Sequence, residues 1–454
     1  MTKVLFVASL TLLAFFYGVL TMNFQIFPYQ ILREAKAAFD AWREVLLTRQ
    51  LYEFVDANGA PRPTAISHGD VADDDEYILM TGFPYLLPSV CPDFGCIAWI
   101  TNRKGDILHG WDIDLETLWA DLPQHVGVKA HVNFNPMGLH LDEGGNLTVA
   151  FHSPSLFPYG VGMAKFDWSG KVIWKRANFS HHWFSVAPDG RIYTPAHVLQ
   201  NGPVPIGNTR FTIDCGSRPI YGEKILVLDQ SGETVEEIPL MDVLVQNGLS
   251  GLIAEGRGGE ERCDPFHLNY VEYVSADIAD EVAGLEEGDL IISVKHLDLI
   301  AVLESKSRRI KWSVIGKTIL QHCPRLLRDG GVIVFDNMGG SKDSGGSRII
   351  RFQYGGDEYN TVFPPTSAAD GVDFWTKEAG HIDPHPDGTR ALVSVKQQGR
   401  VLEIDLRDGR VLWELANTHD LGSNAGRLGA DHGEVVRMSA TGAYYVGRPA
   451  PLRE

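Results

Sequence analysis

Histidine recurs in this chain a few residues ahead of the same kind of phrase, a turn centred on glycine followed by a β-rich strand. Imidazole changes charge near neutral pH and can act as nucleophile, base or metal ligand, so a repeat that carries it is a candidate reactive site. One such unit could arise by chance, whereas five indicate a radial repeat that directs imidazoles toward a common centre. The five histidines are His182, His267, His322, His381 and His432.

The repeat that carries these histidines also predicts the fold. Each copy joins two β-rich runs at a turn and then adds the glycine phrase and its strand, with Asp-Gly, Ser-Gly and Gly-Gly at the turns. Six copies of two hairpins each predict an all-β fold, a six-bladed β-propeller over residues 96–454. The insert at 198–264 is too long for a hairpin loop and is expected to cover a face of the ring. The glycines that mark the copies are Gly145, Gly190, Gly288, Gly330, Gly388 and Gly442.

In a propeller, the innermost strand of each blade lines the central channel, and the residues at its start point toward the axis. The five histidines should therefore lie together at one end of the channel. Three of them have polar neighbours. His267 and Asn269 are two residues apart and therefore share one face of a strand. Lys295 and His296 end the next strand and add a positive charge, and His181 pairs with His182.

In order, these phrases resemble the bacterial arylsulfate sulfotransferase family, whose members work without a nucleotide sulfate donor. That family carries a paired-His phrase, then D-x-x-H-x-N, then S-S-R-H, then Q-H-D leading into a glycine turn and F-D-N. The matching stretches here are Ser180–His182, Asp264–Asn269, Ser293–His296 and Gln321–Asn337, and the resemblance spans about residues 130–440. The family fold is a six-bladed propeller, in agreement with the repeat count.

The resemblance implies ping-pong transfer with His322 as the nucleophile. His322 would attack the sulfur of an aryl sulfate, a phenol would leave, and the sulfohistidine would pass its sulfuryl group to a second phenol. Neighbouring donors and positive charge would stabilise the sulfuryl oxygens in flight, and one histidine would protonate the leaving phenolate. Catalytic roles are expected for His322, His267, His182, Lys295 and Asn269, and substrate contacts for His181, His296, His381 and His432.

Two residues depart from the family pattern. Lys295 stands where the family has arginine and loses the two-pronged grip on a sulfate. Cys323 stands where the family has an aspartate that could orient the imidazole. These departures keep open a non-catalytic propeller, acting as a scaffold or as an accessory subunit of a membrane complex. A hydrolase or a quinone-linked oxidoreductase on the same ring is the remaining alternative.

Neither a cofactor nor a bound metal is expected from the pattern. Three imidazoles can hold zinc, but no HxH or HxxxH pair stands at the repeated positions and no carboxylate recurs with them. Nucleic acid is also excluded as a partner, because a chain of net charge -18 without a basic run repels phosphate.

The N-terminus departs from the globular composition of the rest. After Lys3 no charge appears until Arg33, and the apolar run is long enough to span a bilayer, with no small-residue cleavage site behind it. We therefore expect residues 1–22 to be a single-pass signal anchor in the inner membrane, with the propeller facing the periplasm. Residues 23–95 should form an amphipathic helix and an irregular linker, and residues 1–52 could pack on a membrane partner.

Five cysteines suit an oxidising compartment. Cys91 and Cys96 could close the small loop CPDFGC, and Cys215 and Cys263 could clip the long insert. Cys323 would then be left over. Five unpaired thiols are the alternative, because pairing does not follow from sequence.

Overall fold

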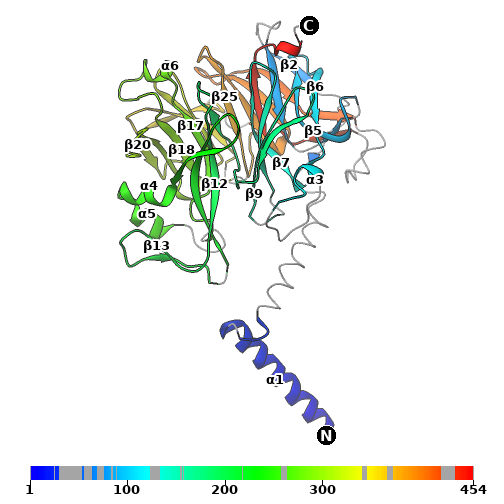
Figure 1. Cartoon of the computed structure of the whole chain (residues 1–454), viewed down its shortest axis with the longest axis vertical. Coiled ribbons are helices and arrows are strands. Elements are labelled where there is room, and N and C mark those ends of the chain that lie inside the picture. Colours follow the sequence, from blue (N-terminus) through cyan, green and yellow to red (C-terminus); the bar gives the residue numbers. More distant parts are fainter. Residues whose placement is uncertain are drawn as a thin grey trace.

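Antiparallel sheets account for most of the described chain, and six of them have four or five strands (Figure 1). This arrangement confirms the predicted all-β, six-bladed propeller. The computed structural model describes residues 2–24, 26–29, 54–55, 64–68, 76–82, 85–87, 89–122, 133–153, 156, 158–216, 218–256, 263–339, 345–365, 372–420 and 435–452.

Four of the blades use four consecutive or nearly consecutive strands each. The second blade has β7 (Asn135–Leu141), β8 (Leu147–His152), β9 (Gly160–Phe166) and β10 (Val172–Arg176). The third has β11 (Ser185–Val186), β12 (Ile192–Gln200), β15 (Ile220–Leu228) and β16 (Thr234–Pro239). The fourth has β17 (Leu268–Tyr273), β18 (Leu290–Val294), β19 (Leu299–Leu303) and β20 (Ile310–Ile315). The fifth has β21 (His322–Leu326), β22 (Gly331–Asp336), β23 (Arg348–Gln353) and β24 (Tyr359–Phe363).

The first and sixth blades combine strands from both ends of the chain. The first contains β3 (Tyr77–Thr81), β4 (Tyr85–Leu87), β5 (Cys91–Thr101) and β6 (Ile107–Asp112), and β3 pairs with the late strand β31 (Gly442–Val446). The sixth contains β25 (His381–Pro384), β26 (Arg390–Val395), β27 (Arg400–Asp405) and β28 (Val411–Ala416), with β2 (Thr64–Ser67) as a fifth strand. The sheets therefore begin before the predicted boundary at residue 96, because ring closure recruits strands from the Pro/Gly/Asp-rich stretch.

The first strands of successive blades contact one another around the axis, from β11 through β17, β21, β25 and β31 to β7. The core lies between blades rather than inside one layer. Along β15, Ile225 and Val227 pack toward the fourth blade, while Leu226 and Leu228 pack toward the second. Successive residues of a strand point to opposite faces, and both faces are buried here. This is why the inner runs are continuously apolar instead of alternating.

The long insert is tied to the ring. It extends the β12–β15 hairpin with β13 (Val204–Pro205) and β14 (Thr212–Ile213), and α4 (Leu240–Gln246) and α5 (Ser250–Glu255) follow β16. The Cys215–Cys263 disulfide joins the tip of this hairpin to the segment that enters β17. The pairing is one of those the sequence allowed.

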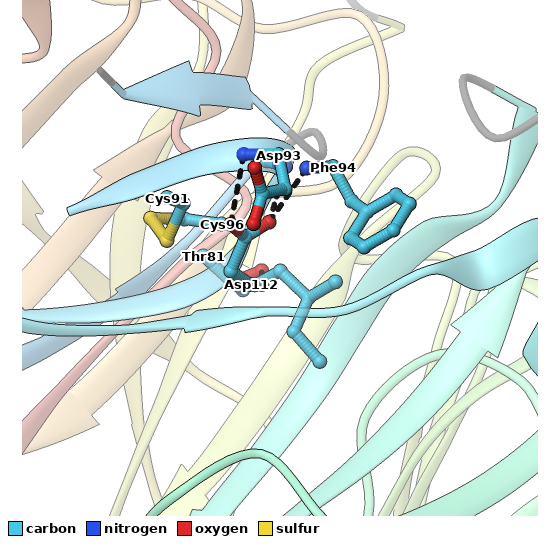
Figure 2. The surroundings of a disulfide bond; sticks show 8 residues. Thr81, Cys91, Asp93, Phe94, Cys96 and Asp112 are labelled. Atoms are coloured by element: carbon cyan, nitrogen blue, oxygen red, sulfur yellow. Dashed lines mark hydrogen bonds between the residues drawn. A yellow bond between two sulfur atoms is a disulfide. The ribbon is translucent and has the colours of Figure 1, made fainter. Parts of the chain in front are cut away.

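A second disulfide, Cys91–Cys96, closes the small loop at the start of β5 (Figure 2). The carboxylate of Asp112 accepts hydrogen bonds from the backbone amides of residues 93, 94 and 95 at 3.0, 2.8 and 2.7 Å, as Figure 2 shows in part. A Cβ at Gly110 would lie 2.7 Å from Cys96 Sγ and 2.8 Å from Cys91 Sγ, so the strand beneath the disulfide needs glycine here.

The N-terminal segment forms helix α1 (Thr2–Phe24), drawn in blue in Figure 1. Among the residues that the structure describes, however, no helix has the length and hydropathy needed to cross a bilayer, so the predicted transmembrane anchor is not found. The amphipathic helix predicted after it lies, beyond residue 29, outside the described residues until Phe54.

The remaining elements are short. A small sheet joins β1 (Phe54–Val55), β30 (Val435–Met438) and β29 (Thr418–Asp420). The other short helices are α3 (Leu115–Leu118), α6 (Ala276–Ala279), η3 (Lys295–Leu297), η6 (Lys396–Gln398) and η8 (Ala450–Leu452).

Candidate active site

The predicted site histidines lie where inner strands begin. His322 opens β21, His381 opens β25, and His267 directly precedes β17. Trp183, next to His182, forms a parallel bridge with Tyr270 of β17. Inner strands of neighbouring blades therefore run in the same direction, and their entry residues share one end of the channel. His432 lies outside the described residues.

Irregular backbone turns these side chains out of the strand alternation. His182 and His267 adopt positive φ values of 57° and 52°, and Cys323 has a φ of 48°. The strand register shifts between Leu268 and Tyr270, and again in β21 just after His322. Such bulges re-aim side chains, and strained backbone of this kind concentrates at functional sites.

His322 has a defined tautomer. Its Nδ1 lies 2.7 Å from Oδ1 of Asn337. The Asn337 amide nitrogen donates to the backbone oxygens of Thr376 and Ala379 at 3.0 and 2.8 Å, which identifies the other amide atom as the oxygen. Nδ1 must then carry the hydrogen, and Nε2 presents a lone pair. Burial, reinforced by the charge of Lys295, lowers the pKa of His322 to about 3, so the ring is neutral at physiological pH.

His267 forms a dyad with a carboxylate. Its Nδ1 lies 2.5 Å from Oδ2 of Asp264, and the Tyr159 hydroxyl lies 3.1 Å from the same nitrogen. Burial, together with the charge of Lys295, holds the pKa of His267 well below its usual value. A neutral ring that donates Nδ1–H to Asp264 leaves Nε2 free to accept a proton.

His182 completes the group of three. Its ring centroid lies 5.0 Å from that of His267, and the charges of His267 and His322 both contribute to its lowered pKa, after burial. His181 Nδ1 lies 2.7 Å from His182 Nδ1. The structure thus brings His182, His267 and His322 together, while His181 lies behind His182.

Two lysines stand at this end of the channel. Lys295 begins η3 after Ser293-Val294, and Lys396 begins η6 after Ser394-Val395. The two turns have nearly the same entry geometry, with φ and ψ of -107° and 94° at Val294 and -108° and 88° at Val395. Both lysines lower the pKa of His322, after burial. Sequence reasoning missed Lys396, although the repeated Ser-Val-Lys phrase marks it.

His152 and Tyr159 were also missed. His152 lies 5.3 Å from His182 and Tyr159 lies 5.5 Å from His267, measured between ring centroids. They come from β8 and from the stretch just ahead of β9, in a blade where the repeat carries no histidine at the expected phrase. The pattern of spacing alone therefore did not point to them.

Two predicted site residues, Asn269 and His296, hydrogen-bond to backbone oxygens near the reactive histidines. The Asn269 amide donates at 2.8 Å to the backbone oxygen of Gln321, the residue before His322. His296 Nδ1 donates at 2.6 Å to the backbone oxygen of Asp264 and packs 4.7 Å from His267, between ring centroids. Both hold the reactive histidines in place.

His381 and His322 both contact Trp183. The centroid of the Trp183 ring lies 5.9 Å from that of His322 and 5.8 Å from that of His381. His381 lines a cavity of about 630 Å³ with Arg325 and Asp383, further along the inner strands. His381 begins its strand at the same end as His322 but lines this cavity, and its role as a substrate contact stays a prediction.

Cys323, which replaces the family's aspartate, is a buried thiol. Its sulfur lies 3.3 Å from both the backbone oxygen and the backbone nitrogen of Ile382. Burial raises the pKa of the Cys323 thiol to about 12, so the thiol stays protonated. The side chain joins two inner strands and leaves the orientation of His322 to Asn337.

Two groups of side chains have ligand atoms close enough to hold a metal ion. One is His181, His197 and Glu223, and the other is Asp264, His267 and His296; within each group these atoms lie within 4.8 Å of one another. The repeat predicted no metal because no carboxylate recurs with its histidines. Both carboxylates come from the insert hairpin and its return, outside the repeat.

The chain is thus a six-bladed propeller that gathers neutral imidazoles and two lysines at one end of its channel. A sequence profile of the arylsulfotransferase (ASST) family matches residues 139–418, more than half of the chain and all the residues of this site. The chain belongs to that family.

No curated protein sequence matches the chain. Among solved structures, it is similar to a protein of unknown function from Bacteroides caccae, with 10% identity and a TM-score of 0.45 over 82% of this chain and 99% of that one. It is also similar to virginiamycin B lyase from Staphylococcus aureus, with 10% identity and a TM-score of 0.35 over 64% of this chain and 72% of that one.

Proposed function

We propose that this protein transfers a sulfuryl group from an aryl sulfate to a phenolic acceptor through a covalent intermediate on His322. The observation that carries the proposal is the tautomer of His322. Because Asn337 accepts from Nδ1, the lone pair sits on Nε2 of a neutral ring, which is the nucleophilic form of imidazole. Membership of the arylsulfotransferase family supplies the substrate class.

In the first half of the reaction, Nε2 of His322 attacks sulfur and the bond between sulfur and the aryl oxygen breaks. The aryl group leaves as phenolate and takes a proton from solvent, while a bond between nitrogen and sulfur forms. Lys295 and Lys396 are the cations that would offset the charge on the sulfuryl oxygens and on the departing phenolate. Lysine acts here as a point charge in place of a bidentate arginine.

In the second half, an acceptor phenol attacks the same sulfur and the bond to His322 breaks. His267 is the proposed base for the acceptor's proton, because Asp264 holds its Nδ1–H and leaves Nε2 open. That proton is later lost to solvent, which balances the one taken up by the first phenolate. His182 would donate to a sulfuryl oxygen in both halves.

The test uses the full chain with 4-nitrophenyl sulfate as donor and a phenol as acceptor. We expect nitrophenolate release that depends on the acceptor, and an alkali-quenched digest in which the His322 peptide gains the mass of one SO3 group. His322→Gln should abolish both, with a loss of kcat of at least about 10⁴-fold.

The matched control is His419→Gln, which removes a buried histidine bonded to Asn417 at 2.7 Å, away from these rings. It should keep turnover within a few-fold of the native chain. Folded native protein that yields neither turnover nor an adduct would contradict the proposal, as would an adduct that persists in His322→Gln.

We also propose that the propeller works in an oxidising compartment, the periplasm. The support is the presence of two disulfides, Cys91–Cys96 and Cys215–Cys263, in a chain with one further cysteine. Rapid alkylation of denatured protein from intact cells should label Cys323 alone. Labelling of all five cysteines would contradict this location.

A further inference from the structure

We propose that His181, His197 and Glu223 bind a divalent transition-metal ion, with Zn2+ the best match, directly behind the reactive histidines. Two imidazoles and one carboxylate are a common protein ligand set for zinc, with the fourth position left for water. None of the three has a direct role in the sulfuryl transfer proposed above, so the metal site is a separate feature of the protein.

One ligand atom from each residue lies within 4.8 Å of the other two, and each imidazole approaches a different oxygen of Glu223. His181 Nε2 lies 3.1 Å from Glu223 Oε2, and His197 Nδ1 lies 3.5 Å from Glu223 Oε1. A tetrahedral zinc with bonds of about 2.0–2.1 Å separates its ligand atoms by about 3.3 Å. The two observed separations lie on either side of that value.

Rigid strands hold the three side chains in this arrangement. His197 of β12 and Glu223 of β15 are direct partners across the hairpin. His181 is fastened to the other edge of β12, because its amide donates to the backbone oxygen of Pro195 at 3.2 Å. A Cβ at Gly160 would lie 2.8 Å from Cδ2 of His197 and 3.1 Å from Cδ2 of His181, so glycine makes room for both rings.

Three polar atoms of this group lack a hydrogen-bond partner in the part of the chain that the structure describes. His181, His197 and Glu223 are 0%, 1% and 3% exposed. Within the described part of the chain, neither ring nitrogen of His197 makes a hydrogen bond, and neither does Glu223 Oε1. Buried polar atoms are rarely left unpaired, and a cation among them would satisfy all three ligands at once.

The second group of potential ligands is the weaker candidate. There, Asp264 Oδ2 already accepts from His267 Nδ1 at 2.5 Å, and His296 Nδ1 already donates to a backbone oxygen at 2.6 Å. Binding a metal would require these hydrogen bonds to break. In the first group, neither ring nitrogen of His197 nor Glu223 Oε1 makes a hydrogen bond within the described chain, and only the contact between His181 Nε2 and Glu223 Oε2 would be replaced by bonds to the ion.

A metal on His181 would also fix the tautomer of His182, and the value of that effect for catalysis rests on the proposed function. If Nε2 of His181 binds the metal, its Nδ1 must carry hydrogen and donate to Nδ1 of His182 across 2.7 Å. The remaining hydrogen of neutral His182 then sits on Nε2. The metal would position a hydrogen-bond donor beside the sulfuryl group without touching the substrate.

The test measures metal content by mass spectrometry on the full chain after gel filtration in metal-free buffer. We expect close to one equivalent of zinc or another first-row transition metal. His197→Gln and Glu223→Gln should each reduce it at least about five-fold. The matched controls, His296→Gln and Asp264→Asn, alter the second group and should retain the metal.

Chelator-stripped native protein provides a second measurement that does not depend on variant folding. Calorimetric titration with Zn2+ should show one site, and Co2+ loading should give visible absorption bands that Zn2+ displaces. Absence of bound metal in the isolated chain together with no Zn2+ binding after stripping would overturn the proposal. Loss of metal in the controls but not in Glu223→Gln would overturn it as well.

These outcomes are separate from the sulfuryl-transfer test. Asn337, not the proposed metal, sets the tautomer of His322. A metal-free protein that still forms the His322 adduct would remove the metal and keep the transferase. A metal-loaded protein that forms no His322 adduct would contradict the transferase proposal and leave the metal site standing.

Discussion

At the scale of single residues, the orientation of His322 depends on an amide that is itself held on three sides. Asn337 is fully buried and spends both amide hydrogens on backbone oxygens, so its oxygen can only face the imidazole. A nucleophilic histidine needs such a partner, because the other tautomer would present N–H instead of a lone pair to the substrate. In this chain the partner, Asn337, directly follows β22, the strand that pairs with the strand of His322.

Asn337→Ala should therefore lower kcat for aryl sulfate turnover about 10–100-fold, the usual cost of losing a group that orients a reactive imidazole. KM should change little, because Asn337 is not expected to contact substrate. Asn417→Ala is the control: Asn417 bonds His419 at 2.7 Å and donates to two backbone oxygens in the same way. Equal kinetic losses in the two variants would show that only stability is involved.

The two lysines are the second residue-scale feature. Lys396→Ala and Lys295→Ala should each lower kcat/KM for an aryl sulfate about 10–100-fold, because each removes a charge-assisted contact to the sulfuryl group. Lys295→Arg should keep most of the activity. Lys165→Ala, in the cavity that His381 lines, removes a lysine paired with Asp142 at 2.9 Å and should leave kcat/KM unchanged. A Lys396→Ala enzyme as active as the Lys165→Ala enzyme would count against this site.

The residues that sequence reasoning found and those it missed differ in one physical respect. His267, His322 and Lys295 begin or end strands of the repeat, so a repeated phrase predicts that they share one end of the ring. Glu223 and His197 lie on a hairpin extended by an insert, and their position depends on pairing across 26 residues of chain that no repeat describes. Spacing within a repeat carries no information about such partners.

At the scale of elements, the β12–β15 hairpin is the part of the molecule that departs most from a simple blade. Its tip is joined by Cys215–Cys263 to the segment that carries Asp264, and this segment enters β17. The disulfide thus fixes the dyad partner of His267 against the insert. The blades could be predicted because a turn motif in the sequence joins each strand pair. The insert has no such motif to show where the chain rejoins the sheet.

Removing the two disulfides should have different effects. The sequence separations are 48 for Cys215–Cys263 and 5 for Cys91–Cys96. Loop-closure entropy then predicts losses of about 4 and about 2 kcal/mol in the free energy of unfolding for the paired Cys→Ser variants. Activity should fall further in the Cys215/Cys263 variant, because Asp264 follows Cys263. Urea unfolding and turnover of both variants would check this, and a larger stability loss in the Cys91/Cys96 variant would refute it.

At the scale of the whole molecule, the ring is closed by strands from opposite ends of the chain. β3 takes β31 as a neighbour, and β28 takes β2, so the first and last blades each contain a strand from the other end. Blades arranged in a closed ring leave only short, protected sheet edges. The repeat predicted six blades, but the early strands were not predicted, because their apolar pattern is short and their partners lie more than 300 residues away.

The closed ring also covers histidines outside the site, and these contribute to how stability depends on pH. His109 stacks on Trp168 at a ring distance of 3.7 Å, and His419 lies against Trp99. Burial lowers the pKa of each to about 4. The unfolded chain binds a proton at each near pH 6.5 while the folded chain does not, so stability falls as pH drops below 6.5 and levels off only near pH 4.

Between pH 7 and pH 5 the buried His419 should cost up to about 2 kcal/mol in the free energy of unfolding, from the separation between its folded and unfolded pKa values. The half-buried His109 should cost less, because solvent screens part of its shift. Urea unfolding of the native chain should thus give a falling stability over this range. In the double variant His109→Gln and His419→Gln, the free energy of unfolding should fall less steeply with decreasing pH, because neither ring titrates. This holds whatever the stability of the variant at pH 7. If its slope equals that of the native chain, the two rings bind protons equally in the folded and unfolded protein over this range, and burial does not lower their pKa.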